Sequence, residues 1–317
     1  MLVITYALDP TADYVLRELT DRGVPFWRTD LADFPGRSTL TAELRTEGRW
    51  GGRMGDELRG VDLSEVRSVW WRKPTSYSFP DTMSEPERRF AASQAKGAVP
   101  GVLGSLPGVL WVNRPERNAD CTKPVQLAVA ARAGLRVPET LITNDPAAVA
   151  PFAARCGGHI VTKVFGSIVH TEGGKRGQLY TRRVPPDQYN NPRIGLTAHL
   201  FQREITAKAY EIRVTAVAGK LFPVAIHAPD GPARLDWRRN SSSLTHTPVD
   251  LPHDVIRGIH TMLGGLGLVY AALDLIVDSD GTHYLIDVNP GGQWAWIDLT
   301  RESITLALAD LLEKGTL

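Results

Sequence analysis

Three oxygen-bearing side chains near the C-terminal end of the chain are spaced for binding a metal ion. Residues 272–292 contain two apolar runs that flank Asp280-Gly281, a dipeptide typical of a two-residue hairpin turn. With this dipeptide at the centre of the turn, Asp274 lies directly opposite Asp287, and Asn289 follows on the same face as Asp287. Carboxylate and amide oxygens suit Mg²⁺, which proteins hold with a few groups and substrate phosphates. The segment therefore predicts a metal site that serves a nucleotide.

The same hairpin could instead carry its two acids on a solvated outer face. Acidic side chains placed directly opposite one another repel, so the pairing of Asp274 with Asp287 is unfavourable unless a cation lies between them. The other polar features of the chain favour the metal site.

Two lysines are candidates for binding nucleotide phosphates. Lys163 closes the apolar segment 159–164 and precedes a loop, 165–177, that contains four glycines. Glycine lets backbone N–H groups approach phosphate oxygens closely, and a neighbouring lysine adds positive charge. Lys123 precedes a helix that Pro124 opens. A plain hairpin loop and a solvated lysine are the alternatives for these two segments.

Two extended segments further along offer more polar side chains. The alternating run 201–205 can present backbone groups to an adenine ring and the carboxylate of Glu204 to a ribose. In 211–217, Glu211 and Arg213 share one face of a strand, and an arginine beside a triphosphate can stabilise the charge that moves in phosphoryl transfer. An exposed cross-strand ion pair, worth under about 1 kcal/mol, is the alternative. The cations of the polar loop 236–240 could equally be solvated.

The composition is that of an ordinary globular protein. The chain has 317 residues, 43% hydrophobic and 22% charged, and a net charge of +1, which argues against a broad nucleic-acid surface. No uncharged apolar run is long enough to span a bilayer, and glycines and prolines in 97–113 predict a helix end and a loop. Two cysteines, Cys121 and Cys156, and a start without a signal peptide favour a cytoplasmic location.

The predicted elements alternate between strands and helices, which indicates an α/β fold in three parts. Asp9 and Pro10 start the first helix, which Gly23 ends. The predicted helices are 10–23, 84–98, 124–134, 146–157 and 253–263. The predicted strands are 2–5, 26–28, 69–72, 110–113, 137–142, 159–164, 178–182, 201–205, 210–218, 221–227 and the hairpin, with exposed hairpins in 38–60.

Taken in chain order, these features resemble the ATP-grasp ligases. The resemblance rests on Lys123, Lys163 with its glycine loop, Gln202-x-Glu204, Glu211-x-Arg213 and Asp274 followed by Asp287-x-Asn289-Pro-Gly. It implies an ATP-grasp fold with an N-terminal pre-grasp α/β domain (1–118), a central subdomain (119–198) and a C-terminal α+β grasp subdomain (199–317). Within that superfamily, the opening segment 3–13, Trp70–Pro74, Trp111–Asn113 and Asp236–Arg238 resemble graspetide synthetases of the actinobacterial type.

The resemblance also implies ATP and Mg²⁺ as cofactors. It places Lys123, Lys163, Ser167 and Glu211 at the nucleotide and Gln202 and Glu204 around the adenosine. Arg213 would contact the transferred phosphoryl group, with Arg238 as a second catalytic residue, and Asp274, Asp287 and Asn289 would bind Mg²⁺. Many ATP-grasp enzymes have Glu where this chain has Asp287, so the shorter side chain changes the metal geometry.

The implied activity is that of a peptide macrocyclase. It would phosphorylate Asp or Glu side chains of a ribosomal precursor peptide, made of leader and core, and form intramolecular ω-ester or ω-amide crosslinks with Thr, Ser or Lys. Nucleic acids and membranes are not expected partners, and a homodimer stays open. One alternative is an intermolecular ATP-grasp ligase that adds glutamate or another amino acid to a protein or peptide tail. Another is a nucleotide-binding regulatory protein without catalysis. The basic pairs 72–73 and 182–183 could grip an acidic peptide or be solvated.

Overall fold

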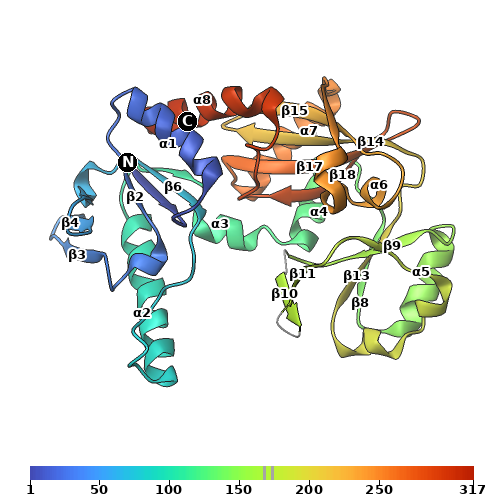
Figure 1. Cartoon of the computed structure of the whole chain (residues 1–317), viewed down its shortest axis with the longest axis horizontal. Helices are drawn as coiled ribbons and strands as arrows, with labels where there is room; N and C mark the ends of the chain where they lie inside the picture. Colours follow the sequence, from blue (N-terminus) through green and yellow to red (C-terminus); the bar gives the residue numbers. More distant parts are fainter. Residues whose placement is uncertain (167–168, 173–174) are drawn as a thin grey trace.

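Four parallel strands form the N-terminal sheet, in the order β2-β1-β6-β7 (Figure 1). The computed structural model describes residues 1–166, 169–172 and 175–317. The strands are β1 (Leu2–Thr5), β2 (Trp27–Thr29), β6 (Ser68–Lys73) and β7 (Leu110–Val112). Both faces of the sheet are covered: Val3 packs with α1 (Pro10–Asp21), whereas Leu2 and Ile4 pack with α2 (Glu85–Gly104).

The N-terminal helices begin as the sequence predicts. The side chain of Asp9 accepts a hydrogen bond from the backbone of Ala12, and Gly23 follows α1 in the left-handed region at a φ of 69°. The second helix is longer than predicted, because α2 continues through Pro100 to Gly104. Burial of Val99, Val102 and Leu103 against the sheet outweighs the lost backbone hydrogen bond at proline. The predicted exposed hairpins are the meander β3 (Thr39–Leu44), β4 (Trp50–Gly55) and β5 (Gly60–Asp62).

Two helices, α3 (Pro115–Asp120) and α4 (Lys123–Arg132), lead into a second sheet of order β12-β9-β13-β8. Its strands are β8 (Thr140–Thr143), β9 (Ile160–Lys163), β12 (Arg182–Arg183) and β13 (His199–Arg203), with α5 (Val149–Arg155) packed beside them. A separate hairpin comprises β10 (Val169–Glu172) and β11 (Lys175–Gln178). The predicted strand 178–182 is therefore wrong, since β11 ends where it should begin.

The pairing of β13 bears on the domain boundaries. This strand hydrogen-bonds to β8 and β9 although it follows residue 198, where we expected the central part to end. The division into three domains stays a prediction, and the pairing favours a central part that extends to Arg203.

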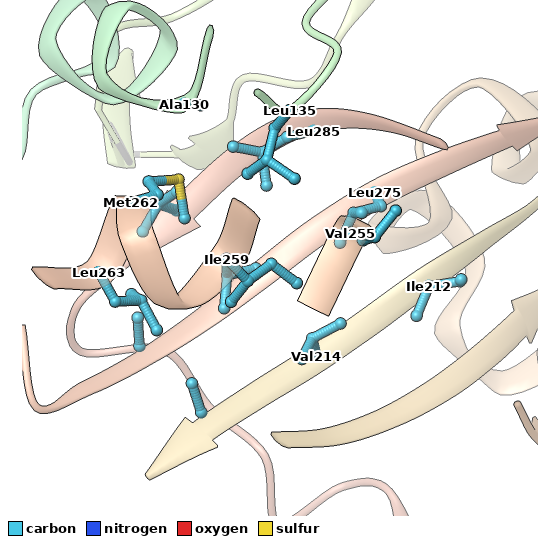
Figure 2. Packing of buried hydrophobic residues seen from close by; sticks show 14 of the residues in the cluster. Ala130, Leu135, Ile212, Val214, Val255, Ile259, Met262, Leu263, Leu275 and Leu285 are labelled. Carbon is cyan, nitrogen blue, oxygen red and sulfur yellow. The ribbon is translucent and has the colours of Figure 1, made fainter. Parts of the chain in front are cut away.

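A five-stranded antiparallel sheet of order β16-β15-β14-β17-β18 forms the C-terminal part. Its strands are β14 (Lys208–Val217), β15 (Lys220–His227), β16 (Thr245–Pro248), β17 (Tyr270–Asp278) and β18 (His283–Asn289). Its helices are α6 (Pro232–Leu235), α7 (His253–Leu266) and α8 (Asp298–Lys314). Figure 2 shows Val255, Ile259 and Met262 of α7 packed onto the strands. On the opposite face, α8 packs with Val217 and Tyr270 and covers part of the sheet.

Short 3₁₀ turns occupy several connections. They are η1 (Leu31–Asp33), η2 (Leu63–Glu65), η3 (Pro146–Ala148), η4 (Pro186–Gln188), η5 (Pro192–Leu196) and η6 (Trp237–Ser243). Within the described part of the chain, every helix is too short or too polar to cross a membrane. The predicted α/β class is confirmed by the mixture of a parallel sheet, antiparallel sheets and covering helices.

Two buried amide side chains join the parts. Asn113, directly after β7, accepts hydrogen bonds from the backbone of Val269 and Tyr270 and donates to the carbonyls of Tyr270 and Pro290. Gln126 on α4 donates to the carbonyl of Val288 at 2.7 Å and accepts from its N–H at 3.1 Å, as a neighbouring strand would. These contacts fix the N-terminal sheet and α4 against β17 and β18.

Candidate active site

Three charged side chains form a row across the C-terminal sheet. Arg213 on β14 lies opposite Asp274 on β17, which lies opposite Asp287 on β18. Arg213 Nη1 donates to Asp274 Oδ1 at 2.8 Å. Asn289 follows on β18, and all four side chains line one cavity of about 980 Å³. The structure thus brings together the three predicted metal ligands and the predicted catalytic arginine.

The register of this row is the predicted one, but its local cause differs. The turn between β17 and β18 has three residues, 279–281, because Asp278 and Thr282 close it with two hydrogen bonds. The N–H of Asp278 donates to the carbonyl of Thr282, and the N–H of Thr282 donates to the side chain of Asp278. This shifts the pairing by one residue. A bulge at Ile286 restores it, so that Asp274 again faces Asp287. The prediction of a two-residue turn was wrong. The pairing of Asp274 with Asp287 was still correct, because the longer turn and the bulge shift the register in opposite directions.

The bulge also sorts the side chains of β18. Leu285 and Val288 are three residues apart, which on a regular strand would put them on opposite faces, yet both are in the core against α7. The extra residue, Ile286, makes this possible and leaves Asp287 and Asn289 on the cavity face. The bulge at Ile286 therefore allows β18 to place apolar side chains in the core and polar side chains in the cavity.

Each acid of the row has a basic partner. Asp287 forms an ion pair with Lys123 of α4, and Asp274 forms one with Arg213. Burial raises the pKa of Asp274, although Arg213 offsets part of the rise. Burial acts in the same direction on Asp287, but Lys123 outweighs it and the pKa of Asp287 is lowered. The repulsion expected between the two acids is thus relieved by cations of the protein itself.

The donor set suits a magnesium ion shared with phosphates. Among residues 1–166, 169–172 and 175–317, no group of three or more His, Cys, Asp or Glu could hold a metal ion alone. The available ligands are the carboxylates of Asp274 and Asp287 and the amide of Asn289. Such a set suits Mg²⁺, which is bound by few protein groups and completes its coordination shell with water and phosphate oxygens. In addition, Arg213 Nε is buried without a hydrogen-bond partner in the described chain, as expected of a donor aimed at a ligand.

Lys163 is the second cation of the cavity, and its environment differs from that of Lys123. Its Nζ donates to Oε1 of Gln202 at 2.9 Å, and Gln202 donates onward to Thr140 at 3.0 Å. Burial, together with the charge of Lys123, lowers the pKa of Lys163 to about 8. Among the residues that the structure describes, the hydrogen-bond partner of this half-buried lysine is the neutral Gln202, which leaves its charge well suited to an incoming phosphate.

The two predicted nucleotide carboxylates line the same cavity but are already paired. Glu204 forms a two-pronged ion pair with the exposed guanidinium of Arg183, and Glu211 pairs with Lys208. Burial raises the pKa of Glu211 to about 7 despite Lys208. Both roles at a nucleotide stay predictions.

Arg238 also reaches the cavity, with its guanidinium held by Asp236 at 2.8 and 2.6 Å and its charge 5.8 Å from the ring centre of Tyr180. Asp236 in turn accepts the backbone N–H of Thr181 at 3.0 Å, so η6 is tied to the segment before β12. Ser167 lies outside the described residues, and so does part of the glycine loop in which we expected a phosphate site.

Comparisons with known proteins relate the fold to a class of enzymes. Residues 1–119 match the family model of the MvdD pre-ATP grasp domain. The chain is 27% identical to macrocyclase MdnC from Microcystis aeruginosa MRC, solved with precursor peptide MdnA, at a TM-score of 0.84 over 99% of both chains. The chain has the fold of the ATP-grasp ligases and resembles their graspetide synthetase branch.

Two further structures resemble this chain. One is a RiPP-associated ATP-grasp ligase from Chryseobacterium gregarium with ADP, a leader and a core peptide (22% identity, TM-score 0.90, 100% of this chain and 97% of that one). The other is the ATP-grasp ligase PsnB with minimal precursor, Mg and ADP (22% identity, TM-score 0.79, 100% and 97%). Curated protein sequences gave no match. The predicted family and ATP-grasp fold are confirmed.

The cavity also contains residues that were not among the predicted site residues. Lys73 at the end of β6, Gln293 and the stacked pair Trp237–Trp296, with ring centres 4.8 Å apart, all line it. The sequence does indicate Lys73, because it belongs to the motif Trp70–Pro74, which resembles graspetide synthetases, and to the basic pair 72–73. Gln293 and Trp296 lie beyond the hairpin, and no pattern marked them.

Proposed function

We propose that the chain is an ATP-dependent peptide macrocyclase. It phosphorylates Asp or Glu side chains of a ribosomal precursor peptide and closes intramolecular ω-ester or ω-amide crosslinks with Thr, Ser or Lys. The observation that carries the proposal is the row Arg213–Asp274–Asp287, which faces a cavity shared with Lys123 and Lys163. The fold around this row extends over the whole of a macrocyclase that was solved with its precursor peptide.

The chemistry needs two steps. A free carboxylate cannot acylate an alcohol, because it has no adequate leaving group. A carboxylate oxygen of the peptide first attacks the γ-phosphorus of ATP, the bond to the β-phosphate oxygen breaks, and ADP leaves. A hydroxyl or amine of the same peptide then attacks the acyl phosphate, loses its proton, and expels inorganic phosphate. The peptide loses one water molecule for each crosslink.

The residues of the cavity divide these tasks. Lys163 and Lys123 bind phosphate oxygens. Lys123 can exchange its ion pair with Asp287 for one with a phosphate. Asp274, Asp287 and Asn289 would hold Mg²⁺, and the ion would supply neutralisation of charge on the phosphates. Arg213, fixed by Asp274 and by the carbonyl of Gln293, stabilises the phosphoryl group in transfer.

The remaining nucleotide and catalytic assignments are part of the same proposal. Gln202, Glu204 and Glu211 line the wall where adenosine and its phosphates would lie, and Arg238 faces them from η6. Catalysis is then mainly positioning and charge stabilisation, so no covalent nucleophile is needed. Cys121 fits this reading, since burial raises the pKa of its thiol to about 11.

The proposed partner is a precursor peptide with a leader and a core that contains Thr, Asp or Glu. A cytoplasmic location, a homodimer and the absence of nucleic-acid or membrane partners stay predictions. Sedimentation at several protein concentrations would establish whether the chain is a monomer or a homodimer.

The test is mass spectrometry of the precursor peptide encoded beside the gene, after incubation with the protein, Mg²⁺ and ATP. The proposal expects losses of about 18 Da per crosslink that require ATP, and mild alkali separates esters from amides. Gains that match added amino acids would instead establish the intermolecular ligase. An unmodified peptide would overturn the macrocyclase proposal.

A matched pair of variants assigns the loss of water to this site. The double variant Asp287→Ala with Asn289→Ala removes two proposed metal ligands and should abolish crosslinking. Asp280→Ala removes a carboxylate from the exposed tip of the same hairpin, away from the cavity, and should leave crosslinking intact.

A further inference from the structure

The end of β6 places a further lysine in the active-site cavity, which Lys123, Lys163 and Lys208 also line. Lys73 is half-buried, lines the cavity, and approaches the loop after β18, where its Cε is 3.9 Å from the position that a Cβ on Gly291 would take. Within residues 1–166, 169–172 and 175–317, its ammonium group has no hydrogen bond or ion pair. Lys123, by contrast, has Asp287, and Lys163 has Gln202.

The charges around Lys73 leave it as a surplus cation. Arg72 is fully buried and pairs with Asp9 at 2.6 Å, and Arg213 pairs with Asp274 at 2.8 Å. Each arginine therefore has its own carboxylate. Burial, Arg72 and Arg213 lower the pKa of Lys73, and a bound anion would offset the cost of its charge.

The position of Lys73 is rigidly set. Arg72 donates to Asp9 and also to Oε1 of Gln293 at 2.6 Å, so the end of β6 is tied both to the start of α1 and to the loop after β18. Thr11 on α1 donates to the same oxygen of Gln293. Lys73 is the next residue, so these hydrogen bonds hold it near β18, the strand of the proposed metal ligands. Lys73 itself takes no part in them.

Two kinds of anion enter this cavity, nucleotide phosphates and a peptide carboxylate. Lys163 is on β9 of the central sheet, where it donates to Gln202. Lys73 and Arg213 instead both adjoin the loop after β18. Lys73 Cε is 3.9 Å from the Cβ position of Gly291, and Arg213 Nη2 is 3.0 Å from the Cβ position of Gly292. This loop thus places Lys73 beside Arg213.

We propose that Lys73 binds the acidic side chain of the peptide that is to be phosphorylated and holds its carboxylate beside Arg213. This inference rests on the proposed macrocyclase function and names the residue that selects its substrate. A lysine here favours Asp or Glu over Asn or Gln, because only the acids neutralise the surplus charge.

The test compares Lys73→Met and Lys73→Arg with the wild type on two probes. The first probe is the precursor peptide encoded beside the gene, and the second is the same peptide with every core Asp and Glu changed to Asn and Gln. Lys73→Met should lower kcat/KM for the first peptide by about tenfold or more and leave KM for ATP unchanged. Binding of the labelled peptides, measured by fluorescence anisotropy without ATP, should weaken for the acidic peptide only. Lys73→Arg should recover most of both losses.

Several outcomes would overturn the inference. A rise in KM for ATP with unchanged peptide binding would move Lys73 to the phosphates, and equal weakening for both peptides would show a merely structural role. Lys96→Met, on the exposed side of α2 and outside the cavity, controls for general loss of a lysine and should behave as wild type. A wild-type protein that makes no crosslink would count against the macrocyclase proposal, whereas crosslinking by wild type with no effect of Lys73→Met counts against this inference alone.

Discussion

At the level of single residues, Arg213 is the best-defined part of the site. Strand alternation in 211–217 was enough to predict its face, and hairpin register was enough to predict Asp274 opposite Asp287. The sequence could not predict that Arg213 and Lys123 neutralise these acids, because both contacts join segments more than 60 residues apart.

Arg213→Ala should slow ADP formation by roughly 10²–10³ at saturating ATP and peptide, as expected for a lost electrostatic donor. Arg213→Lys should lose somewhat less, because it keeps the positive charge. It should still be slower than wild type, because one ammonium cannot reach both Asp274 and the carbonyl of Gln293 as the planar guanidinium does. Single-turnover kinetics measure the step. An unchanged rate in Arg213→Ala would remove the residue from the mechanism.

Lys163 should make ATP binding pH-dependent. Its pKa is lowered to about 8 by burial and Lys123, so the ligand-free protein loses this charge as pH rises through 8. Phosphate favours the charged form, so ATP raises the pKa and binding takes up a proton. Affinity should be constant below about pH 7 and fall above pH 8. Calorimetry at pH 8.5 in two buffers of different ionisation enthalpy measures the uptake, which Lys163→Met should abolish.

At the level of elements, the hairpin of β17 and β18 shows where pattern reasoning succeeds and where it stops. Alternation identified both strands, but the turn length depended on side-chain hydrogen bonds of Asp278, and the bulge at Ile286 depended on core packing against α7. The missed helix α8 has buried residues on more than one face, from Ile304 to Leu312, so it lacks a clear helical period.

The loop after β18 is pressed against β17 at Gly292. A Cβ there would lie 2.3 Å from the Cβ of Ala272 and 3.0 Å from Nη2 of Arg213. Gly292→Ala should therefore cost about 1–3 kcal/mol of unfolding free energy and reduce activity by moving Arg213. Urea denaturation and turnover measure the two effects.

Two companion variants locate the cause in this contact. Adding Ala272→Gly to Gly292→Ala restores space and should recover part of the stability. Gly264→Ala on α7, where a Cβ meets nothing within 4 Å, should be harmless. If Gly292→Ala were equally harmless, the close approach of loop and strand would be refuted.

At the level of the whole molecule, the parts are held by few but buried polar contacts. Asn113 is 2% exposed and serves two backbone N–H groups and two carbonyls. The resemblance singled out Trp111–Asn113 but gave no physical reason, since the backbone groups that Asn113 binds lie more than 150 residues away. Three-part organisation was predictable from element order, whereas these joints required the tertiary structure.

Asn113→Ala should destabilise the protein by about 2 kcal/mol or more, because buried backbone groups of Val269 and Tyr270 lose their partner. Asn118→Ala removes only an acceptor of Asn113 and should cost under about 1 kcal/mol. Denaturant titrations of the two variants make the comparison. Equal stabilities would show that Asn113 is not a structural joint.

Gln126 has a consequence for behaviour at high concentration. β18 is the last strand of its sheet, and such an outer strand offers free N–H and C=O groups to a strand of another molecule, a common route to aggregation. Gln126 occupies both groups of Val288, and the backbone of Arg136 takes the N–H of Leu285. Gln126→Leu should raise light scattering with protein concentration, whereas Gln188→Leu should not. The amide that steadies the metal-binding strand would then also keep the enzyme dispersed.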